Sequence, residues 1–174
     1  MLITKEYCKQ LEQLHTENVK FGGAPVPHEN TDFLIEICNR LNTWDVLDYG
    51  CGKGLLAKSL PFPIKEYDPA ILGKTQPPEP ADFVWCGDVL EHIEPECLDA
   101  VLQDLARVIK WRGYLLIHIG PAHKFLPDGR NAHLIQKSPT WWLRKLLDYF
   151  TIERFSTHNT SCQIAVHKLI KEVL

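Results

Sequence analysis

The stretch VLDYGCGKG, residues 46–54, decides the fold of this chain. The segment WDVLDY, residues 44–49, predicts a buried strand, and the three glycines after it let the backbone turn tightly and approach a ligand closely. The helix expected next directs its N-terminal N–H groups at the same place. The spacing G-x-G-x-G departs from the dinucleotide pattern G-x-G-x-x-G, because Leu55 stands where the third small residue belongs. The stretch therefore predicts a ligand-binding turn and disfavours a nicotinamide cofactor.

Strands and helices alternate along the rest of the chain. An amphipathic helix is expected over 31–41, and a long loop over 120–137. Strands are expected over 44–49, 64–67, 83–86, 114–119, 150–155 and 162–169. This order predicts an α/β fold: a Rossmann-like, mainly parallel sheet with helices on both faces and an antiparallel C-terminal strand pair. We expect an N-terminal helix or lid over 1–28 and a single domain over 29–174.

Composition narrows the classes of function. The chain has 174 residues and a formal net charge of -3, so it lacks the basic excess typical of proteins that follow long nucleic acids. No two of its six cysteines form a C-x-x-C pair, which disfavours a zinc ribbon and indicates a reducing compartment. No apolar run approaches the ~18 residues of a membrane span. We expect a cytoplasmic protein without a membrane partner.

The predicted topology brings distant segments together. In open parallel sheets, ligands bind beyond the carboxyl ends of the strands, at the point where strand order reverses. Four segments should meet there: Asp48 to Gly54, Asp68 to Ala70, Gly87 to His92, and the loop after Ile119.

Four motifs in order carry a family resemblance. VLDYGCGKG resembles the first motif of class I S-adenosylmethionine-dependent methyltransferases, YDPA (67–70) the second, and DFVWCGDVLEHIEP (82–95) the fourth-strand segment of the UbiG-like branch. GYLLI (113–117) resembles their fifth strand. LPDGRNAHL (126–134) is similar to a segment of small stand-alone phage and bacterial methyltransferases.

The resemblance implies a cofactor site, with S-adenosylmethionine as cofactor and S-adenosylhomocysteine as product. Asp68 would accept the ribose hydroxyls, and Gly87 and Asp88 would border the reacting methyl group. The cofactor-binding residues implied are Asp48, Tyr49, Gly50, Cys51, Gly52, Asp68, Pro69, Gly87 and Asp88.

One departure from the family concerns adenine. Between Asp68 and Asp82 the family has a helix, a third strand and an acidic residue that binds the adenine amino group, whereas this chain has only a Pro-rich connection. We expect the third strand to be truncated and adenine to be recognised in another way.

The loop after the fifth predicted strand supplies the candidates for acceptor chemistry. A neutral histidine is a suitable general base near pH 7, and the catalytic candidates are His118, His133 and His123. His118 could equally be a satisfied core histidine. The substrate-binding candidates are Arg130, Asn131 and Trp141; Arg130 could instead pair with Asp128.

Asp88, Glu91 and His92 fall within one helical turn. The array resembles the metal-binding E-x-x-E-H of some ubiquinone-pathway and RNA-terminal methyltransferases. In relatives with the same motif the residues that correspond to Glu91 and His92 have a structural role. We therefore expect no metal ion at this site.

The leading functional hypothesis is methyl transfer to an oxygen or nitrogen, less readily a carbon, of a small molecule. The acidic charge and short chain favour it. A nucleotide, DNA or RNA acceptor is an alternative, because Trp141 and Trp142 lie among basic residues over 124–145. A non-catalytic S-adenosylmethionine-binding module is a third. The sequence leaves open whether the protein is a monomer or a homodimer.

Overall fold

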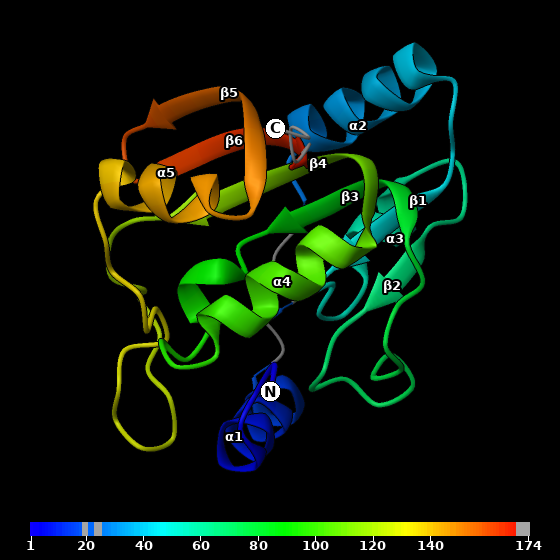
Figure 1. Cartoon of the computed structure of the whole chain (residues 1–174). Helices are drawn as coiled ribbons and strands as arrows, with labels where there is room; N and C mark the ends of the chain where they lie inside the picture. The colour runs from blue at the N-terminus through cyan, green and yellow to red at the C-terminus, as the bar shows by residue number, and fades with distance from the viewer. Residues whose placement is uncertain (19–20, 23–25, 170–174) are drawn as a thin grey trace.

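The computed structural model describes residues 1–18, 21–22 and 26–169. Within these residues six strands form one sheet in the order β2-β1-β3-β4-β6-β5 (Figure 1). The elements are α1 (Lys5–Glu17), α2 (His28–Leu41), β1 (Val46–Tyr49), α3 (Leu55–Ser59), β2 (Lys65–Tyr67), β3 (Ala81–Gly87), the 3-10 turn η1 (Leu90–His92), α4 (Leu98–Val108), β4 (Ile109–His118), α5 (Pro139–Leu147), β5 (Phe150–His158) and β6 (Ser161–Lys168). The expected α/β architecture is confirmed: β1 to β4 pair in parallel, and β6 runs antiparallel to both β4 and β5.

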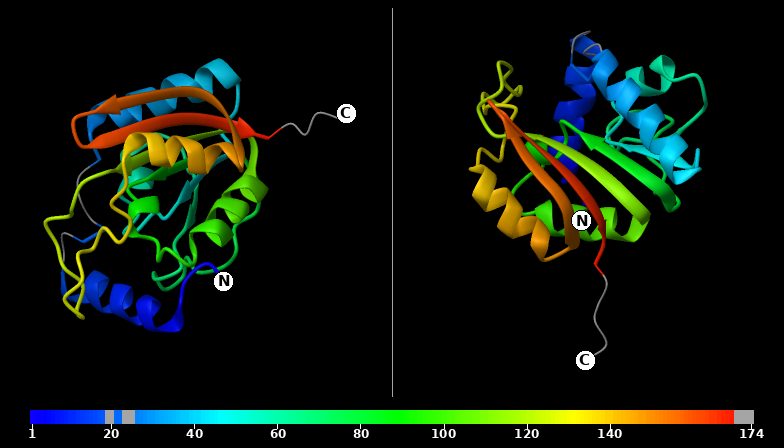
Figure 2. Two further views of the ribbon diagram at one scale, coloured as in Figure 1. Left: turned by 60° about the vertical axis from the view of Figure 1, so that its left-hand side comes forward. Right: turned by 90° about the horizontal axis from the view of Figure 1, so that it is seen from above.

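Helices cover both faces of the sheet (Figure 2). One core joins α4 and α5 to the sheet and includes Leu105 and Trp142, which have no exposed surface. The second core joins α2 and α3 to the other face and includes Leu34 and Trp85. Successive strand side chains point to opposite faces, so neighbouring apolar residues of β3 supply both cores. This two-sided burial explains why the strands read as continuous apolar runs.

The third strand of the family is absent, as expected. Residues 68–80 contain no strand, so β2 forms the edge of the sheet beside β1. Six prolines lie in the whole connection from Pro61 to Pro80, and proline cannot donate a ladder hydrogen bond.

Several element boundaries differ from the sequence prediction, and the starts of α2 and β4 are among them. Helix α2 begins at His28 rather than near residue 31, because the Pro27 carbonyl accepts the first helical hydrogen bonds from Asn30 and Thr31. Strand β4 begins at Ile109, directly after α4, rather than at Tyr114.

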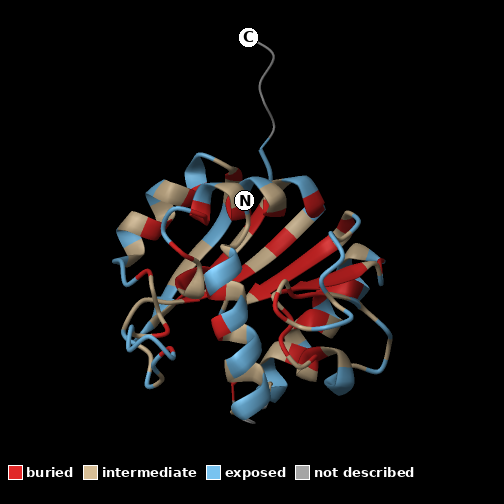
Figure 3. Cartoon of the chain, turned by 90° about the horizontal axis from the view of Figure 1, so that it is seen from below, coloured by how far each residue is buried: buried red, intermediate tan, exposed pale blue. Residues whose placement is uncertain are grey.

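Helix α1 packs on a loop rather than on the sheet. The Thr4 hydroxyl caps it by accepting a hydrogen bond from the Tyr7 N–H. Buried Tyr7 forms a small third core with Leu126 and Ala132 of the loop after β4. Burial colouring shows the contrast between this largely exposed helix and the buried strands (Figure 3). Among the described residues, no helix has the length and apolarity needed to cross a membrane.

Candidate active site

The glycine turn after β1 is fastened to the end of β2. The backbone N–H groups of Gly52 and Ala70 each donate to a different oxygen of the Asp68 carboxylate, both at 2.9 Å. The N–H groups of Gly50 and Cys51 donate to the Tyr67 carbonyl at 2.7 and 3.0 Å. The first two predicted motifs therefore form one hydrogen-bonded unit.

Only glycine suits two positions of this turn. Gly50 has φ +81°, and a Cβ placed on it would lie 2.4 Å from a methyl carbon of Val89. Gly52 has φ +51°, and a Cβ there would lie 2.7 Å from the Gly22 carbonyl oxygen. Side chains at these positions would combine backbone strain with overlap, which explains the G-x-G spacing.

The carboxylate of Asp48 is buried at the end of β1, with 5% of the residue exposed. Burial, and secondarily the negative charge of Glu66, raise the pKa of Asp48 to about 7. A buried carboxylate of this kind favours a cationic group beside it, because the cation restores part of the lost solvation.

One cavity of about 840 Å³ joins the motifs, a size typical of small-molecule sites. All nine predicted cofactor-binding residues line it, and so do the catalytic candidates His118, His123 and His133. The cavity fits S-adenosylmethionine on chemical grounds: Asp68 presents a fixed carboxylate to a diol, the glycines leave the backbone open, and Asp48 suits a cation. The four segments that the topology predicted to meet are thus brought together.

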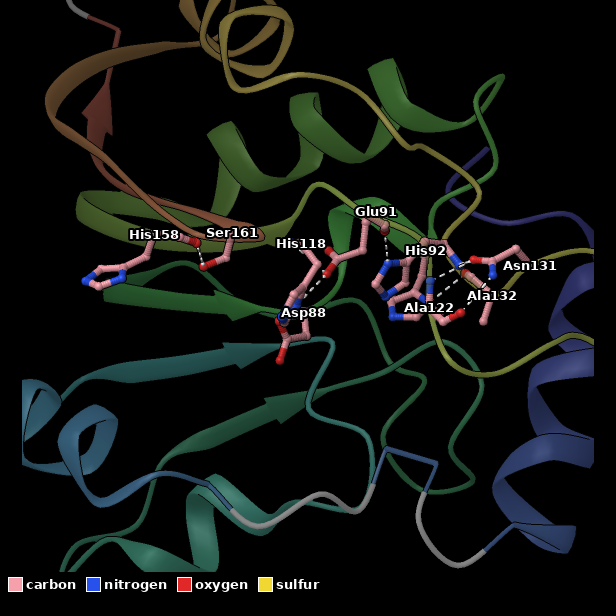
Figure 4. A network of polar contacts seen from close by, with 11 residues as sticks. Asp88, Glu91, His92, His118, Ala122, Asn131, Ala132, His158 and Ser161 are labelled. Atoms are coloured by element: carbon pink, nitrogen blue, oxygen red, sulfur yellow. Dashed lines mark hydrogen bonds and ion pairs between the residues drawn. The ribbon is translucent and has the colours of Figure 1, made fainter.

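Asp88 and His118 form an ion pair (Figure 4), and both residues line the cavity. Asp88 adopts φ +56°, a left-handed conformation uncommon outside glycine. The His118 Nδ1 donates to Asp88 Oδ1 at 2.7 Å, and Glu91 Oε1 lies 3.4 Å from the same nitrogen. The hydrogen bond that His118 donates to Asp88, assisted by Glu91, raises the pKa of His118 to about 10. His118 is therefore charged at neutral pH.

Two further histidines, His133 and His92, lie beside this pair, and each donates a hydrogen bond from Nδ1 to a backbone carbonyl. The His133 Nδ1 donates to the Gly120 carbonyl at 2.6 Å, and the His92 Nδ1 donates to the Ala132 carbonyl at 2.8 Å. Each bond leaves Nε2 as an acceptor when the ring is neutral. The two rings meet edge to face at 4.7 Å between centroids.

Glu91 is fully buried and has two oxygens with different surroundings. Oε1 accepts from the His118 backbone N–H at 3.0 Å, while Oε2 has no partner among the described residues. Glu91, His92 and His133 place one ligand-type atom each within 4.8 Å of one another, a donor set that a divalent ion accepts. The absence of a metal remains a prediction.

Three predicted substrate-binding residues do not line the cavity. Arg130 pairs with Asp128 at 2.7 Å, and its guanidinium lies 5.9 Å from the centre of the Tyr7 ring. The Asn131 side chain bonds both backbone groups of Ala122 and holds the loop together. Trp141 is part of α5 and packs, partly buried, against the main core. A substrate role for these residues remains a prediction.

The N-terminal segment contributes cavity residues that sequence reasoning missed. Tyr7, Leu11, His15 and Phe21 all line the cavity. The apolar stripe of α1 was visible in the sequence, but no motif indicated which surface it covers.

Comparison with known proteins gives a family and a fold. A family model described as a methyltransferase domain matches residues 5–159. The structure of 1,6-didemethyltoxoflavin-N1-methyltransferase from Burkholderia thailandensis, with 1,6-didemethyltoxoflavin and S-adenosylhomocysteine bound, has a TM-score of 0.62 at 14% identity, covering 94% of this chain and 89% of that one. The DhpI complex with S-adenosylhomocysteine has a TM-score of 0.60 at 14% identity, covering 91% and 95%.

A third structure is magnesium protoporphyrin IX methyltransferase from Synechocystis PCC 6803 with bound S-adenosylhomocysteine. Its TM-score is 0.54 at 18% identity, covering 95% of each chain. At these identities the likeness shows the fold. Comparison with curated protein sequences finds no match.

Substituting Asp48 tests the burial of its carboxylate. The folded-state pKa of about 7 lies above the ordinary value of 3.8, so the folded state holds a proton that the unfolded state releases between those values. The unfolding free energy of the wild type should therefore fall as pH rises through this window. Urea titration should show Asp48→Asn gaining stability relative to wild type between pH 5 and pH 8, by a few kcal/mol. Asp32→Asn, at an exposed position, is the control. If the difference in unfolding free energy between Asp48→Asn and wild type were the same at pH 5 and pH 8, the assignment would be contradicted.

The charge on His118 can be read directly by NMR. Its ring should titrate near pH 10 in the wild type, and Asp88→Asn should lower that pKa by removing the hydrogen-bond acceptor that raises it most. Because the folded pKa is raised, the pair stabilises the fold fully below about pH 6.5, and this contribution disappears as pH rises through 10. Asp128→Asn, on the surface beside Arg130, should leave His118 unchanged. Titration of wild-type His118 near 6.5 would refute the pairing.

Proposed function

Because this chain belongs to the methyltransferase domain family, we propose that it transfers a methyl group from S-adenosylmethionine to an oxygen or nitrogen atom of a small molecule. The chain is an S-adenosylmethionine-dependent methyltransferase. The observation that carries the proposal is the shared cavity: Asp68 and the glycine turn line one side, and the histidines of the loop after β4 line another.

The cofactor residues each have a distinct task. The cofactor supplies an electrophilic methyl group when bound, with S-adenosylhomocysteine as the product. Asp68 keeps lone pairs for ribose hydroxyls because each carboxylate oxygen can accept more than the single backbone bond it already has. Asp48 provides negative charge beside the methionine part, and Pro69 borders the adenine.

His118 acts as a charged donor rather than as a base. Its Nδ1 is held by Asp88, and the raised pKa keeps the ring protonated at neutral pH. An imidazolium cannot accept a proton from the methyl acceptor. It can orient an acceptor oxygen or an acidic group through Nε2–H.

His133 is the better-placed base. The bond from its Nδ1 to the Gly120 carbonyl fixes the tautomer and leaves Nε2 to accept a proton. Its ring lines the cavity, 5.8 Å from the His118 ring centre. We assign to His133 the proton that an O–H or N–H acceptor releases as its new bond to carbon forms, and we keep His123 as the third candidate.

The shape of the site favours a small acceptor. Helix α1 and the loop after β4 close over the cavity through the contacts of Tyr7 with Leu126 and Ala132. Two of the structural neighbours are named for small molecules, 1,6-didemethyltoxoflavin and magnesium protoporphyrin IX. The lid expected over 1–28 remains part of this proposal, although residues 19–20 and 23–25 lie outside the described part of the chain. The UbiG-like branch, inferred from the motifs, also remains part of it.

The nucleic-acid alternative has weaker support. Its basis was the basic stretch 124–145, but Arg130 pairs with Asp128 and Lys145 with Asp99. Lys137 lies 5.9 Å from the centre of the Trp141 ring, so this tryptophan is already engaged on one face. Less free charge and ring surface are left for a phosphate backbone and its bases.

Methyl-labelled S-adenosylmethionine identifies the acceptor class. Incubated with a cell lysate separated into metabolite, nucleic-acid and protein fractions, the protein should transfer label to metabolites. Asp68→Ala should abolish this transfer, and exposed Asp32→Ala should not. Label in nucleic acid would support the alternative acceptor class, and no label in any fraction would contradict the proposal.

Substituting His133 separates chemistry from cofactor binding. His133→Asn should lower kcat by about 100-fold or more, because a general base contributes that much, while the Kd for S-adenosylhomocysteine stays within about twofold. His123→Asn, on the same loop, should have a smaller effect on kcat. Full activity in His133→Asn would exclude it as the base.

A further inference from the structure

The connection that stands in place of the third strand folds back onto the end of β2. Residues 68–80 contain no strand, but a short turn forms in which the Lys74 N–H donates to the Ile71 carbonyl at 3.0 Å. The Ile71 N–H donates to the Asp68 carbonyl at 3.4 Å, and the Asp68 N–H donates to the Lys74 carbonyl at 3.1 Å. This closed turn holds Lys74 beside the acid expected to bind ribose.

The side chain of Lys74 reaches from this turn to the glycine turn after β1. Its Nζ donates to the Gly52 carbonyl at 3.3 Å and to Glu66 Oε1 at 2.9 Å. Gly52 is also the residue whose N–H donates to the Asp68 carboxylate. Lys74 therefore contacts both partners of that bond, because its backbone holds Asp68 and its ammonium group holds Gly52.

The ion pair between Lys74 and Glu66 is packed against the protein rather than extended into solvent. The two side chains are 21% and 26% exposed, respectively. A Cβ placed on Gly54 would lie 2.6 Å from Lys74 Nζ, so the ammonium group lies directly on the backbone that leads into α3. A partly buried pair of this kind is screened less by solvent and salt than a surface pair.

Lys74 also balances the negative charge around Asp48. Asp48 and Glu66 are register partners on β1 and β2, so their side chains extend from the same face of the sheet. After burial, the charges of Glu66 and Asp68 raise the pKa of Asp48, whereas the charge of Lys74 lowers it. Among the described residues, Lys74 is thus the cation that favours ionised Asp48.

The other titratable groups that face Asp48 are thiols. Burial raises the pKa of Cys51 in the glycine turn to about 12, and it raises the pKa of Cys86 on β3 well above its ordinary value. Both thiols are therefore neutral near pH 7, and the ionisation of Asp48 responds to the carboxylates of β2 and to Lys74.

We propose that Lys74 is a positioning residue for the cofactor, whose ammonium group fastens the glycine turn and keeps Asp48 available as an anion for the methionine part. The inference rests on the assignment of S-adenosylmethionine as cofactor under the proposed function. Lys74 does not line the cavity, so it acts through Gly52 and Asp48 rather than by touching the ligand. The shortened connection thereby takes part in building the cofactor site.

Calorimetric titration with S-adenosylhomocysteine measures the contribution of the ammonium group. Lys74→Gln removes the charge but keeps the backbone contact with Asp68, so the turn itself should stay folded. At pH 7 the Kd should rise about 10-fold, because one charged hydrogen bond is lost and Asp48 is ionised in fewer molecules. Lys74→Arg, which keeps the charge and hydrogen-bond donors, should recover part of the affinity.

Lys65→Gln is the matched control for this titration. Lys65 lies on β2 and pairs with Asp45 at 2.6 Å, and neither residue lines the cavity. The substitution removes the same charge and one ion pair from the same strand. Its Kd for S-adenosylhomocysteine should stay within about twofold of wild type.

The ionisation of Asp48 gives a second readout that a purely structural role would not change. Carbon-13 NMR of the Asp48 carboxyl group in the free protein should show a midpoint near pH 7 in the wild type. Lys74→Gln should move this midpoint upward because a nearby cation is lost, and Glu66→Gln should move it downward because a nearby anion is lost. The loss of affinity in Lys74→Gln should accordingly be larger at pH 6.5 than at pH 8.

The two readouts separate this inference from the cofactor assignment. Unchanged affinity in Lys74→Gln, an Asp48 midpoint that stays in place or moves downward in that variant, or an equal loss of affinity in Lys65→Gln would each overturn the role of Lys74. Failure of the wild type to bind S-adenosylhomocysteine would overturn the cofactor assignment, whereas the Asp48 titration would still show whether Lys74 controls that carboxylate.

Discussion

The two hydrogen bonds that the Asp68 carboxylate accepts from Gly52 and Ala70 set the geometry on which the site depends. The bond from Gly52 joins the glycine turn after β1 to the end of β2, and the bond from Ala70 holds the carboxylate in place. The segments expected to bind the two halves of the cofactor therefore have one fixed relative position. The turn can take this position only because Gly50 and Gly52 adopt positive φ where a Cβ would overlap a neighbour. Sheet register then places β3 and β4, with Asp88 and His118 at their ends, around the same cavity.

Helix α1 and Gly22 lie against the loops that line the cavity. The Gly22 backbone lies on Gly52, and Tyr7 packs between α1 and the loop after β4. A single helix thus contacts both the cofactor loops and the segment that carries His133. The contacts of Tyr7 and Cys8 with the His92 and Pro69 carbonyls lie on the same helix as the contact of Tyr7 with Ala132.

Much of this site could be predicted because local sequence determines it. The glycine spacing predicted the turn, and the acid at the end of the second short strand predicted the position of Asp68. Parallel topology predicted that Asp88 lies at the same edge of the sheet. The proline-rich connection correctly predicted the missing third strand. The charge of His118 could not be predicted, since it depends on its pairing with Asp88 across β3 and β4. The contribution of α1 depends on tertiary packing, and its amphipathic stripe does not specify what it packs against.

The crystal structure of the protein with S-adenosylhomocysteine tests the central claim most directly. The account predicts that both ribose hydroxyls lie within hydrogen-bond distance of the Asp68 carboxylate, with the amino-acid part against the glycine turn and Asp48. It also predicts that the ligand sulfur lies on the side of the cavity that faces His118 and His133. A ligand bound away from Asp68, or with its sulfur turned away from these histidines, would contradict the account.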